Sequence, residues 1–216
     1  MFQKSTVIIR DGRLDLLKWI ALFTMVIDHV GYAFFPDVTG FRIIGRISFP
    51  IYAFLIAEGS QRTRNKRKYI ERLLLFAFIA QIPYMLMFHT IYPNILFTLV
   101  IGLLFINTTW YNIAILITIG ILLPLDYGWW GLLLPTLFAY GRTRNIFGFL
   151  LIAALTVVNA ISNGALIQLY AIVGFLLIFG MPETEKIQIP VINRWIFYWF
   201  YPVHLLIIYL LSLLLE

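Results

Sequence analysis

The stretch that decides the fold is LFTMVIDHVGYAFF, residues 22–35. It belongs to an apolar run, about residues 14–35, that is long enough to cross the ~30 Å hydrocarbon core of a bilayer as a helix. Inside this run lie Asp28 and His29, two ionisable groups at a depth where an unpaired charge costs free energy. The stretch therefore predicts a membrane helix with a polar site that another part of the chain compensates.

The composition of the whole chain agrees with this interpretation. Of the 216 residues, 62% are hydrophobic, 17% aromatic and only 12% charged, and the mean hydropathy of +0.91 lies outside the range of soluble globular proteins. Apolar runs recur along the entire length and leave no polar stretch for a soluble domain, so we expect one membrane domain, residues 1–216. The absence of cysteine excludes disulfides, thiolate metal ligands and a cysteine nucleophile.

Short polar segments, many with Pro or Gly, separate the apolar runs. This pattern predicts an all-α, polytopic membrane helix bundle with about nine spans. The first run is longer than the ~7–15 residue core of a signal peptide and no small-residue cleavage site follows, so we expect it in the mature protein. The expected spans are about 14–35, 43–58, 73–88, 95–106, 113–125, 129–140, 146–159, 165–180 and 195–214.

Loop charges predict the orientation, because Lys and Arg concentrate in cytoplasmic loops. With the N-terminus inside, the basic loop QRTRNKRKYIER, residues 61–72, is cytoplasmic, and so are Arg142, Arg144, Lys186 and Arg194. The net charge of +6 is then mostly a charge of the cytoplasmic face, which favours anionic lipid and gives no support to nucleic-acid binding. We expect a multi-pass membrane protein with these segments on its cytoplasmic side.

Asp28 and His29 are functional candidates, because ionisable groups at this depth face a bundle interior or a wet cavity; the alternative is a polar contact that only fixes helix packing. Adjacent residues of a helix point about 100° apart, so each needs its own partner. Arg42 and Arg46, four residues apart on the second run, enter at a similar level and offer an ion pair with Asp28. Pro50 predicts a kink beside Arg46, although Arg46 could instead reach the outer head groups.

Two further residues are expected to line a substrate path together with Arg42. Tyr32 lies one turn beyond Asp28, and His204 in WFYPVHLLIIYL is a second histidine within the membrane. Ordinary packing roles are the alternative for both.

Five segments of the chain resemble the TraX family, whose best-known member N-acetylates the first residue of conjugative pilin. They are MVIDHVG, GRISFPIYAFLIAEG, TRNKRKYIERLLLFAFIAQIPY, NILFTL and YPVHL, which run in order over most of the chain. The resemblance also indicates kinship with membrane-embedded acyltransferases. It implies acetyl-CoA as co-substrate and acyl transfer to a peptide or pilin, or to a glycan, in contact with membrane lipid. No metal is implied.

The residues suit such chemistry. A neutral imidazole can accept the proton of an amine, so His29 is the candidate base, with Asp28 tuning it through space. Arg46 could stabilise the oxyanion that forms when the thioester carbonyl is attacked.

A repeated quadruplet is the candidate site for the donor. RTRN occurs at residues 62–65 and again at 142–145, and guanidinium groups suit phosphate oxygens. Arg62, Arg64, Arg142 and Arg144 are therefore expected to bind the phosphates of CoA, although two basic loops that happen to match explain the repeat equally well.

A proton- or ion-coupled transporter is the rival function, with Asp28, His29 and Arg46 as its relay. Carriers often show paired halves with corresponding breaks, and this chain has no such repeat beyond RTRN.

Overall fold

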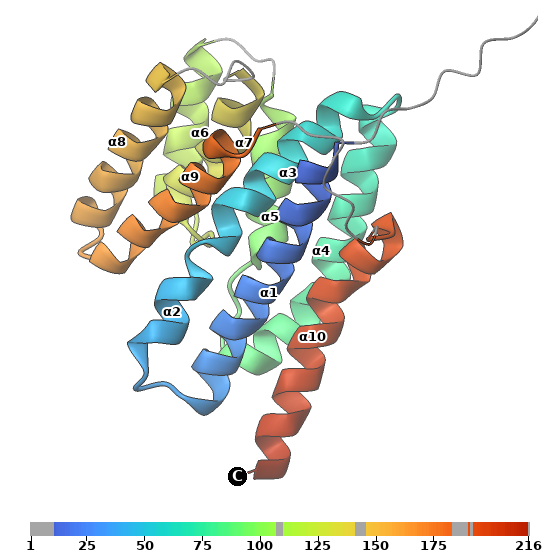
Figure 1. Ribbon diagram of the computed structural model, residues 1–216. Coiled ribbons are helices and arrows are strands. Elements are labelled where there is room, and N and C mark those ends of the chain that lie inside the picture. Colours follow the sequence, from blue (N-terminus) through green and yellow to red (C-terminus); the bar gives the residue numbers. More distant parts are fainter. Residues whose placement is uncertain (1–10, 107–109, 141–145, 183–189, 191, 216) are drawn as a thin grey trace, which may run out of the picture.

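The computed structural model describes residues 11–106, 110–140, 146–182, 190 and 192–215, and every regular element in these ranges is a helix (Figure 1). The helices are α1 (Gly12–Phe34), α2 (Thr39–Gly45), α3 (Ser48–Arg62), α4 (Lys66–Phe88), α5 (Ile95–Leu104), α6 (Trp110–Leu122), α7 (Gly128–Tyr140), α8 (Ile146–Ser162), the 3₁₀-helix η1 (Leu166–Tyr170), α9 (Ala171–Gly180) and α10 (Arg194–Leu215).

All nine expected spans are helical, but within the described residues four helical segments are long and apolar enough to cross a membrane: α1, α2 with α3, α4 and α10. The other five runs form helices of 10–17 residues, shorter than the ~20 residues of a full crossing. Nine complete spans are thus more than the structure shows. The all-α membrane bundle itself is confirmed.

Side-chain caps set several helix starts. Asp11, Asn65 and Asn94 each accept a hydrogen bond from a backbone N–H in the first turn of the helix that follows. The cap at Asn65 corrects one expectation, because α4 begins at Lys66 and most of the basic segment 61–72 is helical rather than a loop.

The second run is interrupted between Gly45 and Ser48, where α2 ends and α3 begins. Pro50 lies in the first turn of α3, where a missing N–H removes no helical hydrogen bond. The proline therefore accompanies a break rather than a kink, and the break separates Arg42 and Gly45 on α2 from the rest of the span.

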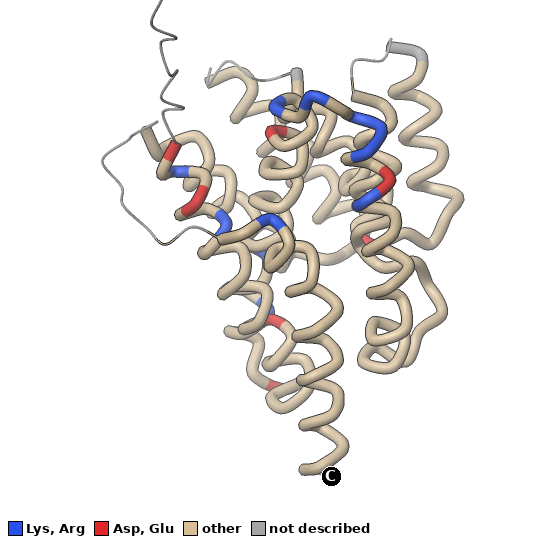
Figure 2. The backbone as a smooth tube through the Cα atoms, turned by 90° about the vertical axis from the view of Figure 1, so that its right-hand side faces the viewer, with Lys and Arg blue, Asp and Glu red and all other residues tan. Residues whose placement is uncertain are grey.

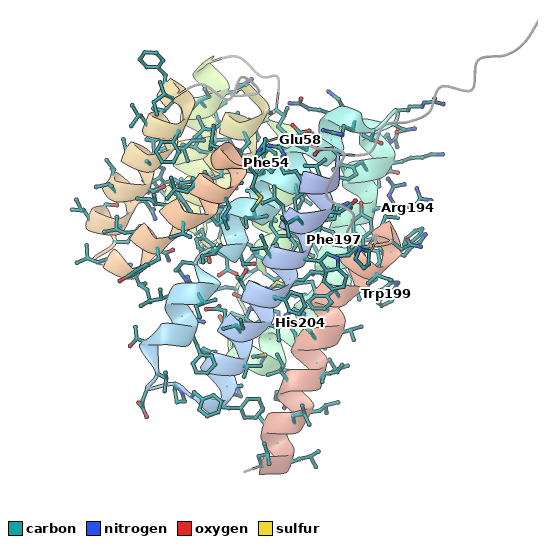
Figure 3. The ribbon with its side chains drawn as sticks, in the orientation of Figure 1. Phe54, Glu58, Arg194, Phe197, Trp199 and His204 are labelled. Atoms are coloured by element: carbon teal, nitrogen blue, oxygen red, sulfur yellow. The ribbon has the colours of Figure 1, made fainter. Side chains whose placement is uncertain are left out.

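α3 lies at the centre of the bundle and packs against α1, α7 and α9, whereas α10 packs chiefly on α4 (Figure 1). Small side chains permit the close approach: Ala21 on α1, Ala53 on α3 and Ala77 on α4 are completely buried. On α10, Phe197 and His204 point toward α1, while Trp199 lies on the outer side and is 48% exposed (Figure 3).

Large apolar side chains cover the outside of the bundle, for example Phe78, Ile82 and Ile161. Such a surface is suited to lipid. Most Lys and Arg residues lie toward the end of the bundle that carries the α3–α4 connection, hereafter the basic end (Figure 2). The chain is a membrane protein by these criteria.

Candidate functional site

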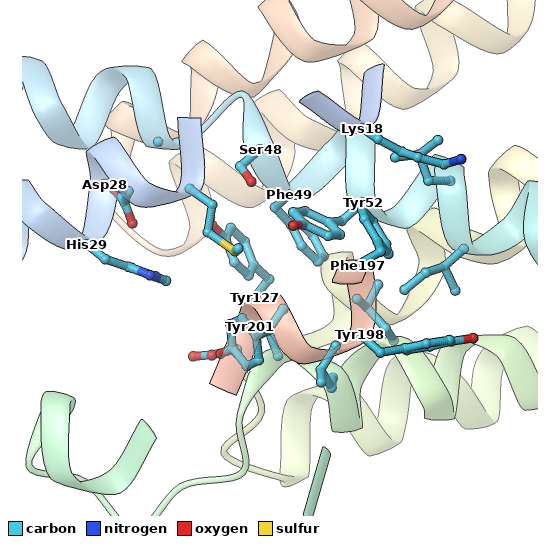
Figure 4. A pocket seen from close by; sticks show the side chains of 18 of the residues that line it. Lys18, Asp28, His29, Ser48, Phe49, Tyr52, Tyr127, Phe197, Tyr198 and Tyr201 are labelled. Carbon is cyan, nitrogen blue, oxygen red and sulfur yellow. The ribbon is translucent and has the colours of Figure 1, made fainter. Parts of the chain in front are cut away.

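A cavity of about 440 Å³ lies between α1, α3, α4 and α10. Near the basic end its wall includes Lys18, Gly59 and Arg194, and toward the opposite end it includes Asp28 and His29. Figure 4 shows this order, with Lys18 at one side of the cavity and the Asp28–His29 pair at the other. The two ionisable residues singled out in the sequence, Asp28 and His29, therefore face an internal space rather than lipid.

Asp28 is held by two arginines. Arg42 Nη1 donates to Asp28 Oδ2 at 2.9 Å, and Arg46 Nη2 donates to Oδ1 at 3.1 Å. The side chains of Asp28 and Arg46 are only 12% and 9% exposed, so this is a largely desolvated ion cluster. The expected pairing of α1 with the second run is present, and Arg46 is turned inward instead of toward head groups.

The close approach of α2 to α1 depends on Gly45. A Cβ at this position would overlap the carboxylate of Asp28. Only a residue without a side chain leaves the carboxylate room between its two arginines.

We predict that Gly45→Ala destabilises the folded protein by ~1–3 kcal/mol, because the added carbon displaces a buried carboxylate from its cluster. Gly40→Ala, on the same helix, is the matched control, since a Cβ there meets nothing within 4 Å. Thermal unfolding in detergent compares them. Equal unfolding temperatures for the two variants would contradict the packing described here.

His29 is joined to His204 by a short hydrogen bond. Nδ1 of His29 lies 2.7 Å from Nε2 of His204, and Nδ1 of His204 lies 2.6 Å from the carbonyl oxygen of Phe200. A carbonyl only accepts, so His204 carries its proton on Nδ1 and offers a lone pair at Nε2. His29 must then donate from Nδ1, which leaves Nε2 of the neutral His29 unprotonated.

This geometry changes the expected position of His204. It does not contribute to the cavity wall, where the sequence suggested it, but stands behind His29 and fixes its tautomer. Asp28 makes no hydrogen bond to His29 in the described structure, as the 100° separation predicts. Tyr32 and Arg42 do line the cavity, and the guanidinium of Arg42 lies over the Tyr32 ring at 5.8 Å.

A second carboxylate faces the same cavity from the α6–α7 connection. Asp126 accepts a hydrogen bond from Tyr84 Oη at 2.9 Å, and the neighbouring ring of Tyr127 lies under the guanidinium of Arg46. Burial raises the pKa of Asp126 to about 6, while the Tyr84 hydrogen bond and the Arg46 charge oppose the rise. Sequence reasoning missed Asp126, since it lies in a short connection with no periodic signal.

We predict a pH dependence from Asp126. Its folded pKa exceeds the ordinary value near 4, so the carboxyl stabilises the fold below about pH 4 and loses this contribution as the pH rises to about 6. Relative to wild type, Asp126→Asn should gain thermal stability from about pH 4 to 6 and show a constant difference above that. A difference that does not change with pH would contradict the raised pKa.

Two of the four residues expected to bind the donor, Arg62 and Arg64, lie outside the cavity wall. Arg62 pairs with Glu58 at 2.9 Å and lies 3.9 Å from Asp11, and Arg64 is exposed. Neither contributes to the cavity wall. Arg142 and Arg144 lie outside the described residues. At the basic end of the cavity the cations are instead Lys18 and Arg194, which the sequence did not single out for this role.

Comparison with known proteins supplies a family. The family model described as "TraX protein" matches residues 13–212. A curated relative from Dichelobacter nodosus, "Probable fimbrial assembly protein FimC, serogroup H1", is 28% identical over 230 residues, covering 88% of this chain and 91% of the relative. "Uncharacterized protein RP591" from Rickettsia prowazekii (strain Madrid E) is 35% identical over 89 residues, 41% of this chain and 34% of that protein. No solved structure matches significantly.

Proposed function

Because this chain belongs to the TraX family, we propose that it is an acetyltransferase of the bacterial cytoplasmic membrane. It takes the acetyl group of acetyl-CoA at the cytoplasmic face and delivers it to the N-terminal amine of a pilin-like peptide at the outer side. The fimbrial assembly name of the Dichelobacter relative supports an acceptor of the pilin type. In this proposal the basic end faces the cytoplasm, which the positive-inside tendency of Lys and Arg supports.

The observation that carries the proposal is the unprotonated Nε2 of His29. The two hydrogen bonds that link His29 to His204 and His204 to the Phe200 carbonyl leave this nitrogen with a free lone pair. It makes no hydrogen bond within the described structure. His29 lines the cavity, so a base is presented to whatever enters it. His204 is a positioning residue that stabilises His29 once it has taken up a proton, as the third group of a catalytic triad does.

Arg46 supplies a fixed positive charge in the same space. Its Nε and Nη2 are used by the carbonyl of Arg42 and by Asp28, whereas Nη1 has no partner among the described residues. A preorganised donor of this kind stabilises the oxyanion that develops on the thioester carbonyl. Asp28 keeps Arg46 in place and balances its charge.

The chemical step follows from these positions. The neutral amine of the acceptor attacks the carbonyl carbon of acetyl-CoA, and His29 Nε2 accepts the proton that the nitrogen loses. Collapse of the tetrahedral intermediate breaks the carbon–sulfur bond, and the proton passes to the departing thiolate. The products are an N-acetylated acceptor and CoA, with no covalent enzyme intermediate.

A second cavity, also about 440 Å³, gives the acceptor a route from the opposite end. Its wall shares Tyr32 and Arg42 with the first cavity and adds His89 and Ser212. Donor and acceptor can therefore approach the region of His29 from different sides of the membrane.

Radiolabelled acetyl-CoA incubated with the detergent-purified protein and a synthetic pilin N-terminal peptide tests this function. We expect label on the peptide with a free amine and none on the same peptide with a blocked N-terminus. Acetyl-CoA should also raise the unfolding temperature, because it binds the folded state. No label on the free peptide, together with no thermal effect of acetyl-CoA, would contradict the proposal.

A further inference from the structure

The part of the cavity between Lys18 at the basic end and His29, hereafter the inner half, has the form of a channel for a long donor. Lys18 and His29 are 11 residues apart on α1, which corresponds to roughly 16 Å along the helix axis. Tyr52 and Phe197 lie between these two positions (Figure 4), and their rings are 5.2 Å apart. A ligand that reaches His29 from the basic end must pass this pair.

The mouth of the channel carries positive charge. Among the described residues, the only carboxylate that contacts Lys18 Nζ is that of Asp15, at 3.0 Å, and the Lys18 side chain is 27% exposed. The guanidinium of Arg194 lies over the Trp195 ring at 5.6 Å, and no carboxylate within the described residues pairs with it. Such a mouth suits phosphate oxygens.

The middle of the channel holds a hydroxyl that has no partner among the described residues. On the same wall Ser48 and Tyr69 donate to backbone carbonyls and Tyr84 donates to Asp126. The Tyr52 hydroxyl is buried and, within the described structure, bonds to nothing. A buried hydroxyl left this way costs free energy, so its presence indicates a partner that arrives with a ligand.

We propose that this half of the cavity binds a phosphorylated arm: Lys18 and Arg194 hold the phosphates, and Tyr52 donates to an amide carbonyl of the pantetheine chain behind the thioester. The proposal rests on the function proposed above and replaces the RTRN segments as the donor site. Tyr52 is a positioning residue, which selects a pantetheine thioester over donors that lack the arm.

Thermal shift titrations with CoA and ADP separate the two contacts, since ADP has phosphates without the arm. Lys18→Ala should weaken both ligands roughly tenfold, through loss of charge-assisted contacts. Tyr52→Phe should weaken CoA roughly three- to tenfold, leave ADP unchanged, and raise the KM for acetyl-CoA without changing kcat. Without ligand, Tyr52→Phe should be at least as stable as wild type, because the orphaned hydroxyl is gone.

Two controls match these variants. Lys66→Ala removes an exposed cation at the same end of the bundle, and Tyr170→Phe removes a hydroxyl remote from both cavities. Neither should change CoA binding. A lipid head group is the other possible source of phosphate. The same thermal shift titration with phosphatidylglycerol in mixed micelles tests it.

Equal CoA affinity of Tyr52→Phe and wild type would overturn the inference while leaving acetyl transfer by the wild type intact. Stabilisation through Lys18 by phosphatidylglycerol but not by ADP would overturn it in favour of a lipid site. Failure of CoA to bind the wild type at all would remove the inference together with the proposed function.

Discussion

Replacing His29 by alanine lowers the rate of acetyl transfer by roughly 10²- to 10⁴-fold, the usual contribution of a positioned general base. The loss should appear in kcat, because His29 acts on the proton that leaves during attack. His29→Gln keeps a polar side chain of similar size but has no basic nitrogen, and it should be equally inactive. Initial rates with saturating acetyl-CoA measure both variants.

Folding controls decide how this loss is interpreted. Both variants should retain the CoA-induced thermal shift of the wild type, since the donor phosphates bind at the far end of the cavity. A His29→Gln protein that transfers acetyl at a near wild-type rate would show that the base lies elsewhere.

Removing Asp28 produces the largest loss of stability that we expect. Asp28→Ala leaves Arg42 and Arg46 without their shared carboxylate, and breaking a buried ion pair by removing one partner costs ~3–5 kcal/mol. Partial exposure of Arg42, whose side chain is 35% accessible, places the effect toward the lower end of this range. Chemical unfolding in mixed micelles measures the change in free energy.

The matched control is Asp37→Ala, which removes an exposed acid from the connection between α1 and α2. It should change stability by less than ~0.5 kcal/mol. If Asp28→Ala and Asp37→Ala prove equally stable, the cluster does not hold α2 against α1.

The helix bundle could be predicted from the sequence, because a run of ~20 apolar residues in lipid satisfies its backbone hydrogen bonds by forming a helix. The same reasoning placed Asp28, Arg42 and Arg46 at one level and so predicted their contact. Loop charge was less informative about helix ends. A basic segment such as 61–72 is polar whether it is a loop or the first turns of a helix, and only the cap at Asn65 distinguishes the two.

The remaining parts of the site depend on tertiary geometry. His204 is 175 positions from His29, and nothing local indicates that their rings meet. Asp126 and Tyr52 are ordinary residues in sequence, distinguished only by the cavity that they face. The RTRN repeat is conspicuous as a pattern, but a pattern does not show which contacts an arginine makes: Arg62 pairs with Glu58, and the second copy lies outside the described residues.

Transfer across a sealed membrane tests the central claim most directly. Proteoliposomes are loaded with radiolabelled acetyl-CoA, and the pilin peptide with a free amine is supplied outside. The account predicts that wild-type protein labels the external peptide, that the blocked peptide stays unlabelled, and that His29→Gln vesicles transfer almost nothing. Labelling that requires donor and acceptor on the same side, or that is equal with His29→Gln, would contradict it.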